Sequence, residues 1–417
     1  MAGPRIAVLA TLDTKLDEAR FLADQIRSNN AIPVVINLGT SDVDDPLMDI
    51  SQSTLRAHSV QPGPTEPTKL DVMSSTASGA RAVLVDGIGS GRFDAAIGLG
   101  GGQGSWMASA ALRDLPIGFP RLLVSTAGRD AGQYTGFSDL ASVFSVTDIA
   151  GLNPLLTRVL ATAAAGIVGM AHSTAWREPF PDGLTAMTVY GITTAGARIV
   201  MSELAGKGID VVAFHANGVG GPTMEQQIAA GTFAAVLDWS ITEVADDVVG
   251  GVCAAGDGRL TNAARLHLPQ VVVPGGVDVV NFGAPHTVPE HLRGHPSYAH
   301  TPDATLVRTS VEDNIAIAHL VAGRLTAATA PVTVIVPVGG FSRLSTAGSP
   351  LHDPHADRAF YETLRDDLAD CPAVTIEARP EAINDPSFAH HVATEFAGLI
   401  LGPAGAPQSE RPHHDPL

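Results

Sequence analysis

Short runs of β-branched and aliphatic residues alternate along the chain with longer segments in which apolar residues recur every three or four positions. Nearly every short run ends in Gly, Ser, Thr or Asp. This alternation is typical of parallel strands joined by crossover helices, because buried parallel strands read as continuous apolar runs. In the first half the pattern predicts strands at Arg5–Ala10, Pro33–Leu38, Ala95–Leu99 and Arg121–Ser125, with weaker pairing at Ala141–Val146. It predicts helices at Asp13–Asn29, Ser75–Ile88, Gln103–Arg113 and Asn153–Met170.

The second half of the chain shows the same alternation of predicted strands and helices, but its sequence is not a repeat of the first half. The predicted strands of this half are Thr185–Tyr190, Val211–Phe214, Ala234–Leu237, Gln270–Val273, Ala304–Arg308, Val332–Pro337 and Ala373–Ile376. Helices are predicted at Ala195–Gly206 and Thr223–Ala230, and the acids Asp353 and Asp357 around Pro354 read as a further helix start. The sequence therefore predicts an α/β protein.

A break in this pattern divides the chain into two domains. The segment Ala171–Leu184 carries Pro179, Pro181 and Gly183 and is typical of a linker. We place the N-terminal domain at residues 1–178, the C-terminal domain at 179–405 and a flexible tail at 406–417.

Composition narrows the class of protein. Glycine contributes 43 of 417 residues and aromatic residues only 5%, which favours tightly packed layers of helix on strand. The formal net charge of −18 repels polyphosphate backbones and anionic lipid, so nucleic acid is not an expected partner. No apolar run approaches the ~20 residues of a membrane span, and the N-terminus does not read as a signal peptide. Two cysteines exclude a disulfide framework, so a cytoplasmic location is expected.

The strongest local motif is a glycine-rich loop between a predicted strand and a predicted helix, Gly98-Leu-Gly100-Gly101-Gly102-Gln103-Gly104-Ser105. Glycines let backbone amides approach an anion, and a helix N-terminus adds roughly half a positive charge. The loop lacks the Lys of a P-loop and the third glycine of a dinucleotide fingerprint, which disfavours NAD and leaves a mononucleotide open. A turn with positive φ angles is the structural alternative, but it requires only one or two glycines.

Three further loops follow strands at the same expected edge of the first sheet. In Thr11-Leu12-Asp13-Thr14-Lys15, one residue can cap the helix, Asp13 can meet a ribose hydroxyl or Mg²⁺, and Lys15 can meet a phosphate. The loops 125–128, which includes Thr126, and 134–139 are ligand walls or simple turns.

The second half carries its own polar set beyond the ends of predicted strands. Its members are His215, Asn217 and Glu225, then Asp238, Thr242 and Glu243, then Asp278 and Asn281. Together these side chains suit general acid-base chemistry or metal binding. Each also has a plain structural explanation, such as a core histidine or acids in a first helical turn. The pair His291 and His295 stands among prolines and glycine that leave little helix to align it, so no metal is expected there.

Several of these loops resemble one known family, the bacterial proteins similar to the N-terminal, ATP-binding domain of the tomato mosaic virus resistance protein. The matching stretches run in order along nearly the whole chain: 11–15, 98–101, 144–153, 214–216, 220–221, 224–225, 237–238, 242–243, 249–252, 281–283 and 383–386. The resemblance implies two Rossmann-like domains, each a mainly parallel sheet flanked by helices, with ATP in the first domain, and a homodimer. It places Thr11, Asp13, Gly100, Gly101 and Gly104 at the nucleotide, with Thr126 nearby.

Two departures from the family pattern bear on nucleotide selectivity. Leu16 stands where the family usually has Gly, and Gly102-Gln103-Gly104-Ser105 replaces Ser-Gly-Gly-Thr.

The leading hypothesis is a nucleotide-binding enzyme with ATP on the cradle formed by residues 100–105 and a small acidic metabolite in a cleft between the domains. In this hypothesis His215, Glu225, Asp238, Glu243 and Asp278 carry the chemistry. Two alternatives stay open: a nucleotide-independent hydrolase or lyase that uses the same acids, and a non-catalytic ATP-binding interaction protein.

Overall fold

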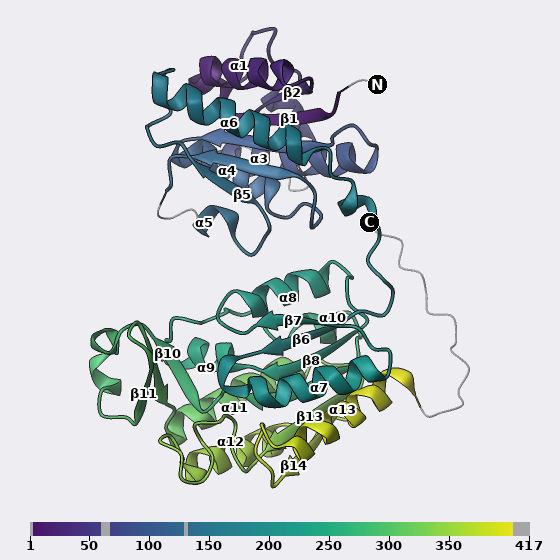
Figure 1. Ribbon diagram of the computed structural model, residues 1–417, viewed down its shortest axis with the longest axis vertical. Helices are drawn as coiled ribbons and strands as arrows, with labels where there is room; N and C mark the ends of the chain where they lie inside the picture. Colours follow the sequence, from purple (N-terminus) through teal and green to yellow (C-terminus); the bar gives the residue numbers. More distant parts are fainter. Residues whose placement is uncertain (1–2, 60–66, 129–131, 403–417) are drawn as a thin grey trace. The chain divides into compact units, whose positions relative to one another are not determined.

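The computed structural model describes residues 3–59, 67–128 and 132–402, and its contacts divide the chain into two compact units, Met1–Pro179 and Phe180–Leu417. Both units are α/β domains built on a mainly parallel sheet flanked by helices, so the predicted fold class is confirmed (Figure 1). The tail predicted at residues 406–417 lies outside the described residues. None of the helices in the described ranges combines the length and the apolarity that a bilayer span requires.

The N-terminal domain contains one five-stranded sheet in the order β2-β1-β3-β4-β5, with every pair parallel. Its strands are β1 (Arg5–Ala10), β2 (Ile32–Asn37), β3 (Ala95–Gly100), β4 (Arg121–Ser125) and β5 (Ala141–Phe144). Its helices are α1 (Leu12–Ser28), α2 (Gln52–Ala57), α3 (Lys69–Gly89), α4 (Gly102–Leu112), α5 (Gly132–Thr135), α6 (Pro154–Met170) and the 3₁₀ turn η1 (Ala175–Arg177).

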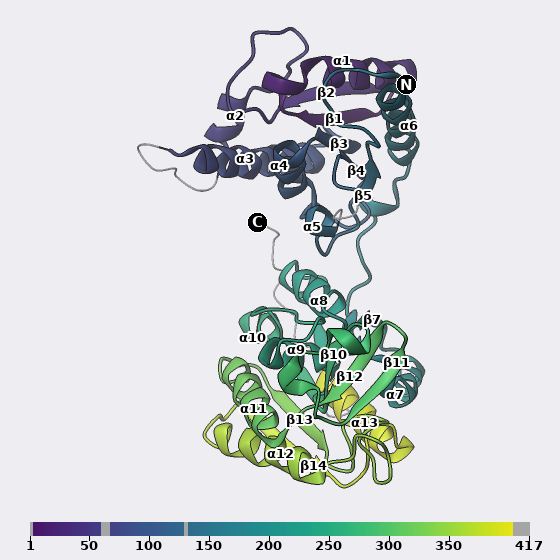
Figure 2. The same ribbon diagram turned by 90° about the vertical axis from the view of Figure 1, so that its left-hand side faces the viewer.

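Alternation along the strands builds two apolar layers in this domain. On β1, Ile6, Val8 and Ala10 face the cluster under α1 and α6, whereas Ala7 and Leu9 face the cluster under α2, α3 and α4. Figure 2 shows the same sheet from a second side. Strands that are apolar on both faces require helices on both faces, which explains the continuous apolar runs of the sequence.

The C-terminal domain has a six-stranded parallel sheet in the order β14-β13-β9-β8-β6-β7. These strands are β6 (Thr185–Val189), β7 (Val211–His215), β8 (Ala235–Ser240), β9 (Gln270–Gly275), β13 (Val332–Pro337) and β14 (Val374–Arg379). The helices are α7 (Thr194–Gly206), α8 (Gly220–Ala229), α9 (Thr242–Val249), α10 (Asn262–Arg265), α11 (Val311–Leu325), α12 (Pro354–Asp367) and α13 (Pro386–Leu401). Helices α7 and α13 cover one face, and α9, α11 and α12 pack on the other.

One predicted strand belongs to a different sheet from the one expected. The segment Ala304–Arg308 is β12, which pairs antiparallel with β10 (Val279–Phe282) and β11 (Ser297–Thr301) in a separate three-stranded sheet. The prediction that this segment belongs to the main parallel sheet was therefore wrong. β11, the hairpin partner of β12, is mostly exposed and polar, so it lacks the apolar run of a buried strand. For this reason the sequence did not predict it.

The start of the predicted linker packs on the N-terminal domain. The Trp176 ring contacts Phe119 edge to face, and Arg177 forms an ion pair with Asp94 at 2.8 Å. These contacts explain why the N-terminal unit extends to Pro179.

Candidate functional site

The N-terminal sheet has a single point where the strand order reverses, between β1 and β3. Chain order runs from β1 outward to β2 and then returns to the other side of β1 with β3. Open parallel sheets bind ligands outside the carboxyl ends of the strands at such a point. Helices α1 and α4 both begin here, and a Cβ atom on Gly104 would lie 3.6 Å from the Thr11 hydroxyl. The structure thus brings the two predicted cofactor loops together.

The N-terminus of α4 has free amides aimed beyond the sheet. Its N-cap, Gly101, has no side chain, and no group in the described ranges accepts a hydrogen bond from the amides of Gly102, Gln103 or Gly104. Three such donors and the positive end of the helix dipole are the groups from which an anion site can be built. Ser105 was predicted to belong to the cradle, but its amide and hydroxyl are both bonded within the protein. Its amide donates to Gly101 O at 2.7 Å, and its buried hydroxyl contacts Gly100 O and Ser125 Oγ.

The glycines of this loop are not explained by backbone conformation, because none of them has a positive φ. Gly100 is required by packing, since a Cβ atom there would lie 2.5 Å from the Gly104 carbonyl carbon. A Cβ atom on Gly101 or Gly102 would meet no atom of the described residues within 4 Å. The loop therefore keeps open space directly above two of its glycines, where an approaching ligand would otherwise meet side chains.

The loop after β1 lies beside this space. Asp13 is exposed, and its Oδ2 accepts hydrogen bonds from the amide and hydroxyl of Thr40. Thr11 is buried and its hydroxyl contacts that of the exposed Thr14 at 3.0 Å. Neither Thr11 nor Asp13 caps α1 with its side chain. Lys15 interrupts the helix with φ −132° and ψ 31° and is half-buried.

The two loops that were predicted as walls of the ligand site, 125–128 and 134–139, reach different edges of the first sheet. Half-buried Thr126 follows β4, whose last residue pairs with Gly100, so it lies at the carboxyl edge. Tyr134 Oη donates to Gly102 O at 3.4 Å and also borders the cradle. Asp139 is instead bound to Arg121, the first residue of β4, so the end of loop 134–139 lies at the opposite edge.

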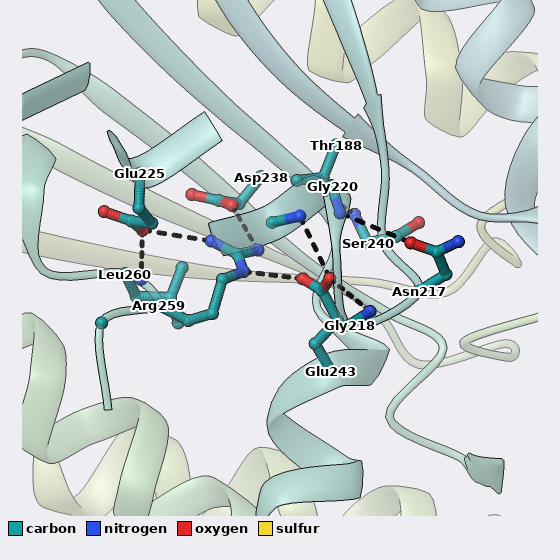
Figure 3. A network of polar contacts seen from close by, with 12 residues as sticks. Thr188, Asn217, Gly218, Gly220, Glu225, Asp238, Ser240, Glu243, Arg259 and Leu260 are labelled. Carbon is teal, nitrogen blue, oxygen red and sulfur yellow. Dashed lines mark hydrogen bonds and ion pairs between the residues drawn. The ribbon is translucent and has the colours of Figure 1, made fainter. Parts of the chain in front are cut away.

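The glycine loop before α8 in the C-terminal domain is occupied by the protein itself. Glu243 Oε1 accepts the amides of Gly218 and Gly221 at 2.8 and 3.1 Å, as Figure 3 shows for Gly218. A carboxylate therefore fills the place that an anion would take at this helix start. The two glycine loops have similar sequences. Of these two, only the N-terminal loop has amides without an acceptor in the part of the chain that the structure describes.

Three of the predicted catalytic carboxylates surround one guanidinium group, that of Arg259 (Figure 3). Arg259 Nη1, Nη2 and Nε lie 3.2, 2.8 and 2.9 Å from Glu225, Asp238 and Glu243. The remaining carboxylate oxygens accept from backbone amides and from Gln270 Nε2. All four charged side chains are buried. The expectation that these acids face a substrate is not met, because every oxygen already has a donor.

Burial and charge act in opposite directions in this cluster. Burial raises the pKa of Glu225, although Arg259 opposes the shift. Burial lowers the pKa of Arg259, but the three carboxylates more than offset this and leave it raised. Arg259 therefore stays charged, and the cluster joins β8, α8, α9 and the loop before α10.

The other two predicted catalytic residues lie apart from this cluster. Asp278 is fully buried, and its Oδ2 accepts from Ser342 Oγ at 2.6 Å, while burial raises its pKa. His215 is exposed at the end of β7, where its ring stacks on Tyr190 with centroids 5.7 Å apart. Tyr190 Oη donates to Asn281 Oδ1, and Asn281 in turn donates to the buried Asp246.

Sequence reasoning missed Arg259, the residue that organises the cluster. A signal was present, because Asp238 lies inside the apolar run Ala235-Val-Leu-Asp-Trp239 and a buried carboxylate needs a cation or several donors. Nothing local distinguishes Arg259 from an exposed arginine. Among the described side chains, no three His, Cys, Asp or Glu residues are grouped as a metal site would need.

The fold defines a two-domain, doubly wound α/β protein. In its first domain, the glycine-rich start of α4 has amides with no acceptor among the described residues. The chain belongs to the uncharacterised protein family UPF0261, whose N-terminal domain profile matches residues 4–175 and whose C-terminal domain profile matches residues 183–400. It is 38% identical over 399 residues to the UPF0261 protein mlr3387 of Mesorhizobium japonicum, covering 93% of this chain and 98% of that protein. It is 37% identical to the UPF0261 protein RA0729 of Rhizobium meliloti, covering 95% of this chain and 99% of the relative.

A plant protein is also similar. The tomato ToMV resistance protein Tm-1(GCR237) is 32% identical over 421 residues, which cover 94% of this chain and 55% of the tomato protein. The resemblance seen in the sequence is thereby confirmed.

Proposed function

We propose that this chain is a nucleotide-binding protein that holds ATP through the amides of Gly102, Gln103 and Gly104. The observation that supports this is the uncapped start of α4 at the reversal point of the sheet, with open space above Gly101 and Gly102. In the glycine loop before α8, Glu243 already accepts the amides of Gly218 and Gly221. Unoccupied amides are therefore not a general property of the glycine loops in this chain.

Asp13 is the acidic group best placed to orient a ribose hydroxyl or a Mg²⁺ ion in this proposal. Its Oδ2 is held by Thr40, which fixes the carboxylate beside the start of α1, and Lys15 follows two residues later. Mg²⁺ would offset the charge of the phosphates, since the cradle itself contains no cationic side chain.

Isothermal titration with ATP and Mg²⁺ tests the placement. Gly101→Asp puts a carboxylate into the open space and should weaken ATP binding about a hundredfold or more through like-charge repulsion. Gly89→Asp is the matched control. It makes the same change at an exposed glycine in the same domain, where a Cβ atom meets nothing within 4 Å. Equal affinity in both variants would refute the cradle.

We also propose that the nucleotide serves an enzyme acting on a small acidic metabolite, in a cytoplasmic homodimer. Of the five predicted catalytic residues, His215 is the exposed one and is therefore the group available for proton transfer. His215→Gln should leave ATP binding unchanged and abolish turnover, and light scattering of the purified protein tests the dimer.

A non-catalytic interaction protein is the second candidate function. The observation that favours it is the burial of Glu225, Asp238 and Glu243 around Arg259. These ion pairs leave the three carboxylates unavailable as catalytic groups. A partner captured equally well by wild type and by His215→Gln, with ATP required in both cases, would support this candidate.

A further inference from the structure

Phe144, the last residue of β5, stands level with the anion cradle. Gly100 at the end of β3 pairs with Ser125 on β4, and Ser125 pairs with Phe144 on β5. Neighbouring strands lie ~4.8 Å apart, so Phe144 is roughly 10 Å from Gly100 along the carboxyl edge of the sheet. A ribose and its first phosphate can bridge a separation of this size.

The Phe144 side chain points to the face of the sheet that α4 covers. Its neighbour Val143 packs into the cluster under α1 and α6, and successive strand residues point to opposite faces. Ser125 shares the face of Phe144, and its hydroxyl contacts Ser105 of α4 at 2.7 Å. The cradle and the phenyl ring are therefore on the same side of the same edge.

The ring is supported from one side and open on another. Gly128, in the loop after β4, lies so close that a Cβ atom there would be 3.0 Å from the phenyl ring. Even so, 49% of Phe144 is exposed. An aromatic face that is backed by main chain and left in water beside an anion cradle has the arrangement of a stacking platform.

We propose that Phe144 is the platform on which the aromatic base of the bound nucleotide stacks. This inference rests on the proposed function, since it takes the phosphates to be held by the amides of α4. The ligand then runs from the cradle past Thr126 to Phe144. The cradle recognises charge, whereas Phe144 discriminates a nucleotide from an inorganic polyphosphate.

The test compares two ligands, ATP and inorganic tripolyphosphate, each with Mg²⁺, by isothermal titration against the full chain. Phe144→Ala should lose about tenfold or more in ATP affinity and leave tripolyphosphate affinity unchanged, because stacking to every base is lost with the ring. Phe144→Tyr keeps an aromatic face and should keep the ATP affinity of wild type.

Phe137→Ala is the matched control. Phe137 is 42% exposed, and the preceding Gly136 lies beside Arg113 at the far end of α4 from the cradle. It should leave both affinities unchanged.

Three results would overturn the inference. An unchanged ATP affinity in Phe144→Ala would show that the base does not stack on this ring. An equal loss of affinity for both ligands would show that the ring supports the cradle instead. A wild type that binds tripolyphosphate as tightly as ATP also removes it, while leaving the cradle in place. Binding of neither ligand by wild type would instead remove the proposed function itself, and this inference with it.

Discussion

Glu243 and Gly221 are fitted to each other in the C-terminal domain. The Gly221 amide donates to Glu243 Oε1 at 3.1 Å, and a Cβ atom on Gly221 would lie 1.8 Å from Glu243 Oε2. The glycine therefore makes room for a carboxylate that comes from the start of α9 and lies against Arg259. A loop that reads as a ligand site in the sequence is in fact an internal contact between two helix starts.

Gly221→Ala should destabilise the C-terminal domain by about 3 kcal/mol, because the methyl group displaces a fully buried charge from its donors. Gly398→Ala is the control, since Gly398 lies inside α13 and a methyl group added there would meet nothing within 4 Å. That change should be neutral or stabilising by up to ~1 kcal/mol. Urea denaturation measures both, and equal midpoints for the two variants would contradict the packing argument.

Arg259→Met should cost about 3–5 kcal/mol of unfolding free energy, because it leaves three buried carboxylates without their cation. Arg324→Met is the comparison, since Arg324 is also largely buried but contacts a single carboxylate, Asp247, at 3.5 Å. The loss there should be clearly smaller. A similar loss in both variants would mean that Arg259 acts through the packing of its aliphatic part alone.

The stability of the C-terminal domain should fall as pH rises from 5 to 8, partly through Asp246. Burial raises the pKa of Asp246 to about 7 from an ordinary value of 3.8, so the folded state holds this proton more tightly than the unfolded state. The stability linked to the proton is fully present below pH ~4 and is lost as pH rises to about 7.

Asp246→Asn should therefore show a shallower decline of unfolding free energy between pH 5 and pH 8 than wild type. Asp303→Asn is the control, because the hydrogen bond from Thr301 lowers the pKa of Asp303 and moves its titration further below this range. An unchanged slope in Asp246→Asn would show that Asp246 titrates elsewhere.

Val146→Gly should stabilise the N-terminal domain by about 1 kcal/mol. Val146 follows the end of β5 with φ 67°, a left-handed conformation that a β-branched residue adopts only with strain. It is 56% exposed, so its replacement removes little packing. Thermal unfolding checks the prediction, with Val146→Ala as a variant that should stabilise less; a lower melting temperature for Val146→Gly would contradict it.

Much of the fold was predictable from local signals. The strands β1 and β4 begin and end where the apolar runs predict, and Asp353 caps α12 as its place before Pro354 indicates. The small sheet of β10, β11 and β12 was not predictable in the same way, because the exposed β11 leaves no apolar trace. For the site, the sequence predicted that Thr11 and the glycine loop share an edge, and the structure places them side by side.

The sequence by itself determined the alternation of strand and helix, the two domains and the positions of both glycine loops, because these depend on residues close together in the chain. Only the tertiary structure decided which glycine loop is free. Glu243 lies 22 residues beyond Gly221, and Arg259 a further 16 beyond Glu243. Their contacts depend on strand order and helix packing, so local sequence carries no signal that separates a carboxylate facing a ligand from one facing a buried arginine.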